Sequence, residues 1–69
     1  MDYYLVLLNP MGFVPDFTDF DAESFGVLFD GPLPVGTTDF VYEDKAYKVE
    51  QQVYNYDKDE FYIVCRANR

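Results

Sequence analysis

Carboxylates are the side chains of this sequence most able to do chemistry, and they are unevenly distributed. Residues 1–44 contain nine Asp and Glu and no Lys or Arg, whereas residues 45–69 contain four acids and five bases. The two parts therefore carry formal charges of −9 and +1, which together give the net charge of −8 at pH 7. A first part without cations cannot neutralise its acids through local ion pairs. Either this charge serves only solubility, or it directs a negative field at a basic partner.

One acidic stretch has the spacing that opens a calcium-binding loop. Residues 19–23 read Asp-Phe-Asp-Ala-Glu, and Asp30 occupies the twelfth position counted from Asp19. Such a loop needs Gly at its sixth position for a sharp turn and a bidentate Glu at its twelfth. Here those positions hold Ser24 and the shorter Asp30. We therefore predict solvated acids, with no metal site and no cofactor.

The side chains of a typical enzyme active site are missing from the sequence. The chain has no His, which is the commonest general base near neutral pH. Ser24 lacks the glycine pattern of a nucleophile elbow, and no glycine-rich loop ends in Lys followed by Ser or Thr. Acid pairs are present, but 69 residues leave little wall for a substrate cleft. We expect a protein that is not an enzyme.

The single cysteine excludes an internal disulfide and a cysteine-rich zinc site. Cys65 alternates with Phe61 and Ile63, so a strand would place all three on one face. Its basic neighbour, Arg66, would point to the other face. We predict that Cys65 packs in the core as a small hydrophobic residue.

Aromatic residues form the second conspicuous group, with 7 Tyr and 7 Phe but no Trp. Alternation along the predicted strands places Tyr42, Tyr54, Tyr56 and Tyr62 on the face opposite the valines of the middle strand. They form either cross-strand aromatic pairs, worth about 0.2–1 kcal/mol each, or an exposed patch that contacts a partner. Base stacking is not expected, because single-strand binders combine aromatic residues with a basic groove that this chain lacks.

Short elements separated by Pro and Gly must position these side chains. Residues 3–8 form an apolar run that ends at Asn9 and Pro10, as is typical of a strand buried on both faces. Residues 9–16 and 30–36 are expected to be irregular because they contain Pro and Gly.

Residues 16–25 predict one or two turns of helix, with a buried aromatic loop as the alternative. Asp16 or Thr18 could cap the start of this helix, and Gly26 could end it. Apolar residues at every second position then predict a strand that ends at Phe29.

The C-terminal part predicts an antiparallel meander. Residues 39–42, 46–56 and 60–66 are rich in β-forming residues, and the loops between them are short enough only for hairpins. We expect one core face and one wetter face. In the middle run, alternation places four residues on one face: Tyr47, Val49, Gln51 and Val53.

The predicted fold class is mainly β (β-rich α+β). The sequence favours a small, strongly bent antiparallel sheet or an SH3-like half-open barrel of about five short strands with one short helical turn. Residues 1–69 are expected to form a single small acidic domain. A core of this size rarely supplies more than about 3–5 kcal/mol, so a homodimer formed across an edge strand is also compatible with the sequence.

The net charge argues against direct binding to nucleic acid or to an anionic membrane, because both surfaces repel it. No apolar run approaches the roughly 20 residues of a membrane span, and Met1 and Asp2 lack the basic start of a signal peptide. We expect a cytoplasmic protein.

The leading hypothesis is a small acidic inhibitor or regulator that occupies a basic surface of another protein, such as a nucleic-acid-binding enzyme. Its carboxylates would mimic nucleic acid, a function met in small proteins of phages and mobile elements. The alternative is a small β-barrel interaction module or structural subunit that binds through a Tyr-rich face or an edge strand. The residues expected to contact a partner are Asp16, Asp19, Asp21, Glu23, Asp30, Asp39, Glu43, Asp44, Tyr54 and Tyr56.

Overall fold

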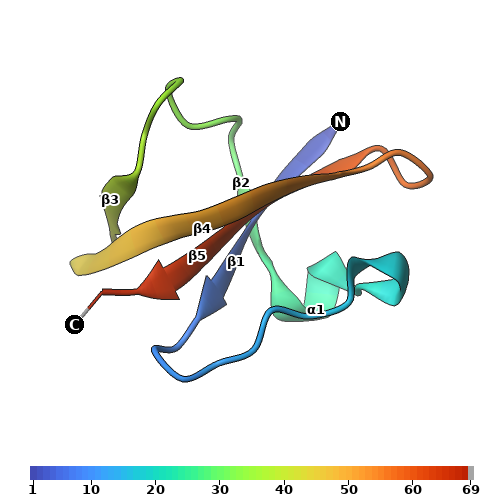
Figure 1. The fold of residues 1–69 in the computed structure, drawn as a ribbon. Helices are drawn as coiled ribbons and strands as arrows, with labels where there is room; N and C mark the ends of the chain where they lie inside the picture. The colour runs from blue at the N-terminus through green and yellow to red at the C-terminus, as the bar shows by residue number, and fades with distance from the viewer. Residues whose placement is uncertain (69) are drawn as a thin grey trace.

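A five-stranded sheet, curled into a half-barrel, forms most of the fold (Figure 1). The computed structural model describes residues 1–68. Its elements are β1 (Asp2–Leu8), the 3₁₀ turn η1 (Phe17–Asp19), α1 (Ala22–Phe25), β2 (Val27–Phe29), β3 (Asp39–Tyr42), β4 (Lys45–Asn55) and β5 (Glu60–Ala67). The strands lie in the order β2-β1-β5-β4-β3. The predicted fold class, a β-rich half-barrel with a short helical turn, is confirmed.

Strand β1 lies inside the sheet, between β2 and β5. It pairs antiparallel with β2 but parallel with β5, where Leu5 lies opposite Ile63. The sheet is therefore mixed, whereas the sequence predicted antiparallel pairing throughout. The parallel pair accounts for the continuous apolar run of β1, because parallel strands are generally covered on both faces. Consistent with this, Tyr4, Leu5 and Val6 are all buried.

Strand β4 contains a β-bulge that reverses its alternation. Val49 lies opposite Cys65, but Gln51 already lies opposite Val64, so Glu50 has no partner on β5. As a result, Val49 and Val53 pack on opposite faces of the sheet. The prediction that Tyr47, Val49, Gln51 and Val53 share one face is wrong, because an inserted residue shifts every later side chain to the other side.

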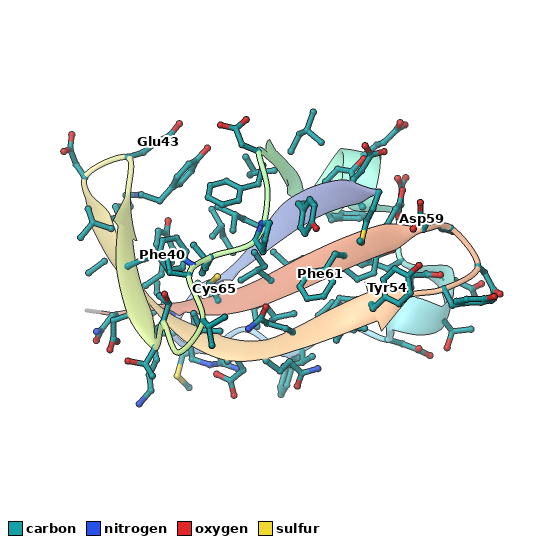
Figure 2. The ribbon with its side chains drawn as sticks, turned by 90° about the horizontal axis from the view of Figure 1, so that it is seen from above. Phe40, Glu43, Tyr54, Asp59, Phe61 and Cys65 are labelled. Carbon is teal, nitrogen blue, oxygen red and sulfur yellow. The ribbon has the colours of Figure 1, made fainter. Side chains whose placement is uncertain are left out.

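The core lies on both faces of β5. One buried cluster consists of Leu5, Tyr47, Ile63 and Cys65 (Cys65 is labelled in Figure 2). Leu33, from the segment between β2 and β3, packs against it. The second buried cluster consists of Tyr4, Val6, Phe20, Ala22, Tyr62 and Val64. The prediction of one core face and one wetter face is wrong, because Phe20 and Ala22 of the helical region cover the second face.

The helical region between β1 and β2 consists of two short pieces, η1 and α1. Gly26 ends α1, and its N–H donates to the carbonyl of Ala22 at 2.8 Å. A Cβ at Gly26 would lie 2.9 Å from that carbonyl oxygen and 3.2 Å from Tyr4 Cβ, so this close approach to β1 requires glycine. Within residues 1–68, no helix has the length and apolar composition needed to cross a membrane.

Arg66 on β5 holds the loop that follows β1 against the sheet. Its Nη1 donates to the carbonyl oxygen of Gly12 at 2.7 Å, and to those of Pro10 and Asn9 at 3.3 and 3.4 Å. Its Nε donates to Glu50 Oε1 at 3.0 Å. Glu50, the unpaired residue of the bulge, is therefore the counter-ion of the arginine that binds this irregular loop.

Replacing Arg66 should loosen the loop and destabilise the fold. We expect Arg66→Ala to lower the free energy of unfolding by about 1.5–3 kcal/mol, the range for hydrogen bonds to charged groups. Urea denaturation measures this loss, with Lys48→Ala as the control, because Lys48 is exposed and lies opposite Arg66 on β4. Equal destabilisation by the two substitutions would contradict the role of Arg66.

The thiol of Cys65 should be unreactive in the folded chain. Cys65 is buried, as predicted, and burial raises the pKa of its thiol to about 11 from an ordinary 9.0. The thiolate is the reactive form, so the native protein at about pH 8 should react with a disulfide reagent at least about 100-fold more slowly than the urea-unfolded chain. The neutral thiol also stabilises the fold below pH 9, and this contribution is lost as the pH rises toward 11. Rapid reaction of the native protein would contradict burial of this side chain.

Candidate functional site

All eight carboxylates predicted to contact a partner are exposed, and the structure divides them between separate places. Four belong to the helical region, and we call them the helical acids: Asp16, Asp19, Asp21 and Glu23. Three belong to β3 and the turn after it, and we call them the hairpin acids: Asp39, Glu43 and Asp44. Asp30 follows β2 and stands apart from both groups.

Two of the helical acids are held in place by capping. Asp16 Oδ1 accepts from the N–H of Thr18 at 2.9 Å, which starts η1. Asp21 accepts from the N–H and the hydroxyl of Ser24, at 3.3 and 2.8 Å, which starts α1. The backbone hydrogen bond from Thr18 lowers the pKa of Asp16, and the side-chain hydrogen bond from Ser24 is the main cause that lowers the pKa of Asp21. Both groups are therefore ionised and oriented in the folded chain.

The hairpin acids lie at the other end of the sheet. Glu43 and Asp44 form the turn between β3 and β4, with φ angles of 50° and 65°. Figure 2 shows Glu43 and Asp59 at opposite ends of the sheet. The turn of Asp59 lies near the helical region, because Lys58 Nζ donates to the carbonyl of Phe20 at 3.0 Å. Strand β4 has 11 residues between these ends and spans about 30 Å, so the two acidic groups face different surroundings.

An open groove of about 430 Å³, here called the apolar groove, lies beside the helical acids. Its apolar lining includes Val6 and Leu8 of β1, Phe13 of the following loop, and Phe20 and Phe25 of the helical region. The side chains of Phe13 and Phe25 are largely exposed, with relative exposures of 92% and 73%. The charged residues of the lining are all acidic: Asp16, Asp19 and Asp21.

A second groove, of about 350 Å³, contains both tyrosines that were predicted to contact a partner. The rings of Tyr54 and Tyr56 meet edge to face, with centroids 6.3 Å apart. Tyr56 is 84% exposed, and the Tyr54 hydroxyl donates to Asp59 Oδ1 at 2.9 Å. Asp16 lines this groove as well as the apolar one. The structure therefore brings the two tyrosines together with one helical acid, Asp16, and with none of the hairpin acids.

The predicted common face of four tyrosines is wrong. Tyr42 packs in the cluster of Leu5 and lies near Phe29, whereas Tyr62 is buried on the opposite face. The Tyr62 hydroxyl donates to Glu60 Oε1 at 2.7 Å, and burial is the main cause that raises the pKa of Tyr62 to about 12. Tyr42 pairs with Lys45, two positions before Tyr47, and so shares the face of Tyr47, whereas Tyr62 pairs with Val53 on the other face.

Sequence reasoning missed the exposed phenylalanines and the cations that bind backbone carbonyls. Phe13 lies between Pro10 and Pro15 in a segment predicted to be irregular, and this was the available signal that its ring could remain exposed. Nothing in the sequence indicates that Lys58 reaches Phe20, which lies 38 positions earlier.

No ion pair of residues 1–68 involves a helical acid, although the charge of Lys58 contributes to the lowered pKa of Asp21. Glu50 pairs with Arg66, and Asp59 pairs with the N-terminal amine at 3.4 Å. In the same range, no three acidic or cysteine side chains gather into a group able to hold a metal ion. The arrangement therefore offers exposed, oriented carboxylates beside apolar and aromatic side chains.

Comparison of the chain with family models, with curated proteins and with solved structures found no match. Any functional conclusion must therefore depend on the geometry of this chain alone.

Removing the cap of α1 should destabilise the fold in a pH-dependent way. We expect Asp21→Ala to lower the melting temperature by several degrees at pH 7, because it removes an N-cap. The lowered pKa of Asp21 means that its stabilisation is present above the ordinary value of 3.8 and is lost as the pH falls below it. Thermal circular dichroism at pH 7 and at about pH 2 measures both effects.

Asp19→Ala is the matched control, since Asp19 is an exposed acid of the same region that caps neither helix. If the melting temperatures of the two variants differ by the same amount at pH 7 and in acid, the capping role of the Asp21 carboxylate is contradicted.

Proposed function

We propose that this chain is a binding protein that occupies a basic surface of another protein, of the kind that nucleic-acid-binding enzymes present to their substrate. The observation that carries the proposal is the set of helical acids: all four are exposed, two of them are oriented by capping, and none forms an ion pair within residues 1–68. Duplex DNA carries one negative charge per about 1.7 Å of axis. Exposed carboxylates on a folded domain would compete for the same basic surface, so we propose that the chain acts as an inhibitor or regulator in the cytoplasm.

Electrostatics supports this mode of binding. A chain with a net charge of −8 repels itself, and a basic partner relieves that repulsion where the acids are most concentrated. Complementary charge also steers diffusional encounter and makes association fast. Because added salt screens exposed charges, affinity for the partner is expected to fall steeply with ionic strength.

A second candidate is an interaction module that binds through Tyr54 and Tyr56. Tyr56 is 84% exposed and its ring lies edge to face with that of Tyr54. Tyrosines are frequent in the energetically dominant part of interfaces. In this case the acidity would serve solubility, and the affinity would depend on the two rings more than on the carboxylates.

Two charge-matched triple variants test the leading proposal. The first neutralises helical acids (Asp19→Asn, Asp21→Asn, Glu23→Gln), and the second neutralises the hairpin acids (Asp39→Asn, Glu43→Gln, Asp44→Asn). Both variants remove three charges, and the amide at position 21 can still cap α1. The immobilised chain first captures a partner from lysate at about 50 mM salt, where electrostatic attraction is strong, and the purified partner is then titrated with each variant.

We expect the first variant to bind the purified partner about tenfold more weakly or worse, and the second to bind nearly as the original chain does. Raising the salt to about 500 mM and adding duplex DNA should both displace the partner. Complete insensitivity to salt would overturn the proposal. Loss of binding in a Tyr54→Ala, Tyr56→Ala variant, with the acid variants unaffected, would favour the interaction module instead.

A further inference from the structure

We infer that the apolar groove binds one aromatic or aliphatic side chain from a basic segment of the partner, whose cations contact Asp16, Asp19 and Asp21. The inference rests on the proposed function and deepens it. Recognition then depends on an apolar anchor placed between positive charges, and not on charge alone.

The groove is built from apolar side chains that leave much of their surface in water. Phe13 and Phe25 are exposed at 92% and 73%, and they line the same groove as Val6 and Leu8. Exposed apolar side chains that cluster in a groove commonly mark a binding site. A volume of about 430 Å³ lies within the range of sites that bury a small ligand or an anchoring side chain.

The charge around the groove identifies the occupant as basic. Its charged lining residues are three carboxylates. Within residues 1–68, Lys58 donates to the Phe20 carbonyl and Arg66 binds Glu50 and the Gly12 carbonyl, and neither forms an ion pair with these three acids. A second copy of the chain would bring the same net charge of −8 toward these acids, and an anionic lipid surface would be repelled for the same reason. A segment with Lys or Arg beside an apolar side chain is complementary both to the three carboxylates and to the apolar lining of the groove.

The walls of the groove are held before the partner arrives. Capping orients Asp16 and Asp21, and Arg66 ties down the loop that carries Phe13. A site that is already ordered loses little conformational entropy on binding. A single apolar side chain buried there can therefore dominate the binding energy, as anchors do at other interfaces.

Two capped pentapeptides of equal charge test the inference on the full chain. One is Lys-Lys-Phe-Lys-Lys and the other is Lys-Lys-Gly-Lys-Lys, and each is titrated into the ¹⁵N-labelled protein at low salt. We expect the phenylalanine peptide to bind about tenfold more tightly or better, because its ring is removed from water. Its largest amide shifts should fall at Val6, Phe13 and Phe25.

Substitutions at exposed positions complete the test. Phe25→Ala should abolish the preference for the phenylalanine peptide, whereas Val41→Ala should retain it, because Val41 is equally exposed at 73% but lies on β3. Asp19→Asn should weaken both peptides, and Asp44→Asn in the distant hairpin should weaken neither.

The possible failures are distinguishable. Equal affinity for the two peptides, with shifts confined to the helical acids, would overturn the groove inference and leave the proposed function standing. Absence of binding by both peptides at low salt would overturn the two together. Concentration-dependent shifts at Phe13 and Phe25 without peptide would show that a second copy covers the groove, which also overturns the inference.

Discussion

Burial of β5 on both faces of the sheet is the constraint on which the rest of this structure depends. Its residues 62–65 are all buried, and they alternate between the two faces of the sheet. A single curled sheet covers only one of these faces, so the chain must supply a second cover. The helical region provides it by placing Phe20 and Ala22 over Tyr62 and Val64. The helical acids are therefore exposed on the same short segment whose Phe20 and Ala22 cover this face.

Much of this architecture could be predicted from local sequence patterns. The apolar run of residues 3–8, the irregular segments with Pro and Gly, and the cap at Asp16 all depend on neighbouring positions. The second cap, at Asp21, was not predicted, because the helical region divides into two pieces. The parallel pairing of β1 with β5 could not be predicted, because it joins segments more than 50 positions apart. The bulge was equally hidden, since Val49 and Val53 are separated by an even number of positions, as on one face of a regular strand, and only the register with β5 reveals the inserted residue.

The candidate site likewise combines features that local sequence patterns predict with features that they do not. Exposure of the acids follows from their chemistry, because a charge is costly to bury without a partner. Their separation into helical and hairpin groups follows from the length and direction of β4, which local patterns do not specify. The meeting of Asp16 with Tyr54 and Tyr56 in one groove is likewise a tertiary feature. The lysine and arginine that bind carbonyls are further examples, since each joins distant parts of the chain.

The arrangement of charge bears on why the chain is so acidic. Solubility alone requires carboxylates anywhere on the surface, and it is favoured when exposed apolar rings are few. Here exposed phenylalanines line the same groove as three acids, while the nearby cations bind backbone carbonyls instead of those acids. Such a surface is poorly suited to a chain that interacts only with water, because its rings stay hydrated and its charges repel one another. A basic partner with an apolar anchor removes both costs at one place, which is why we favour binding over solubility as the purpose of the acidity.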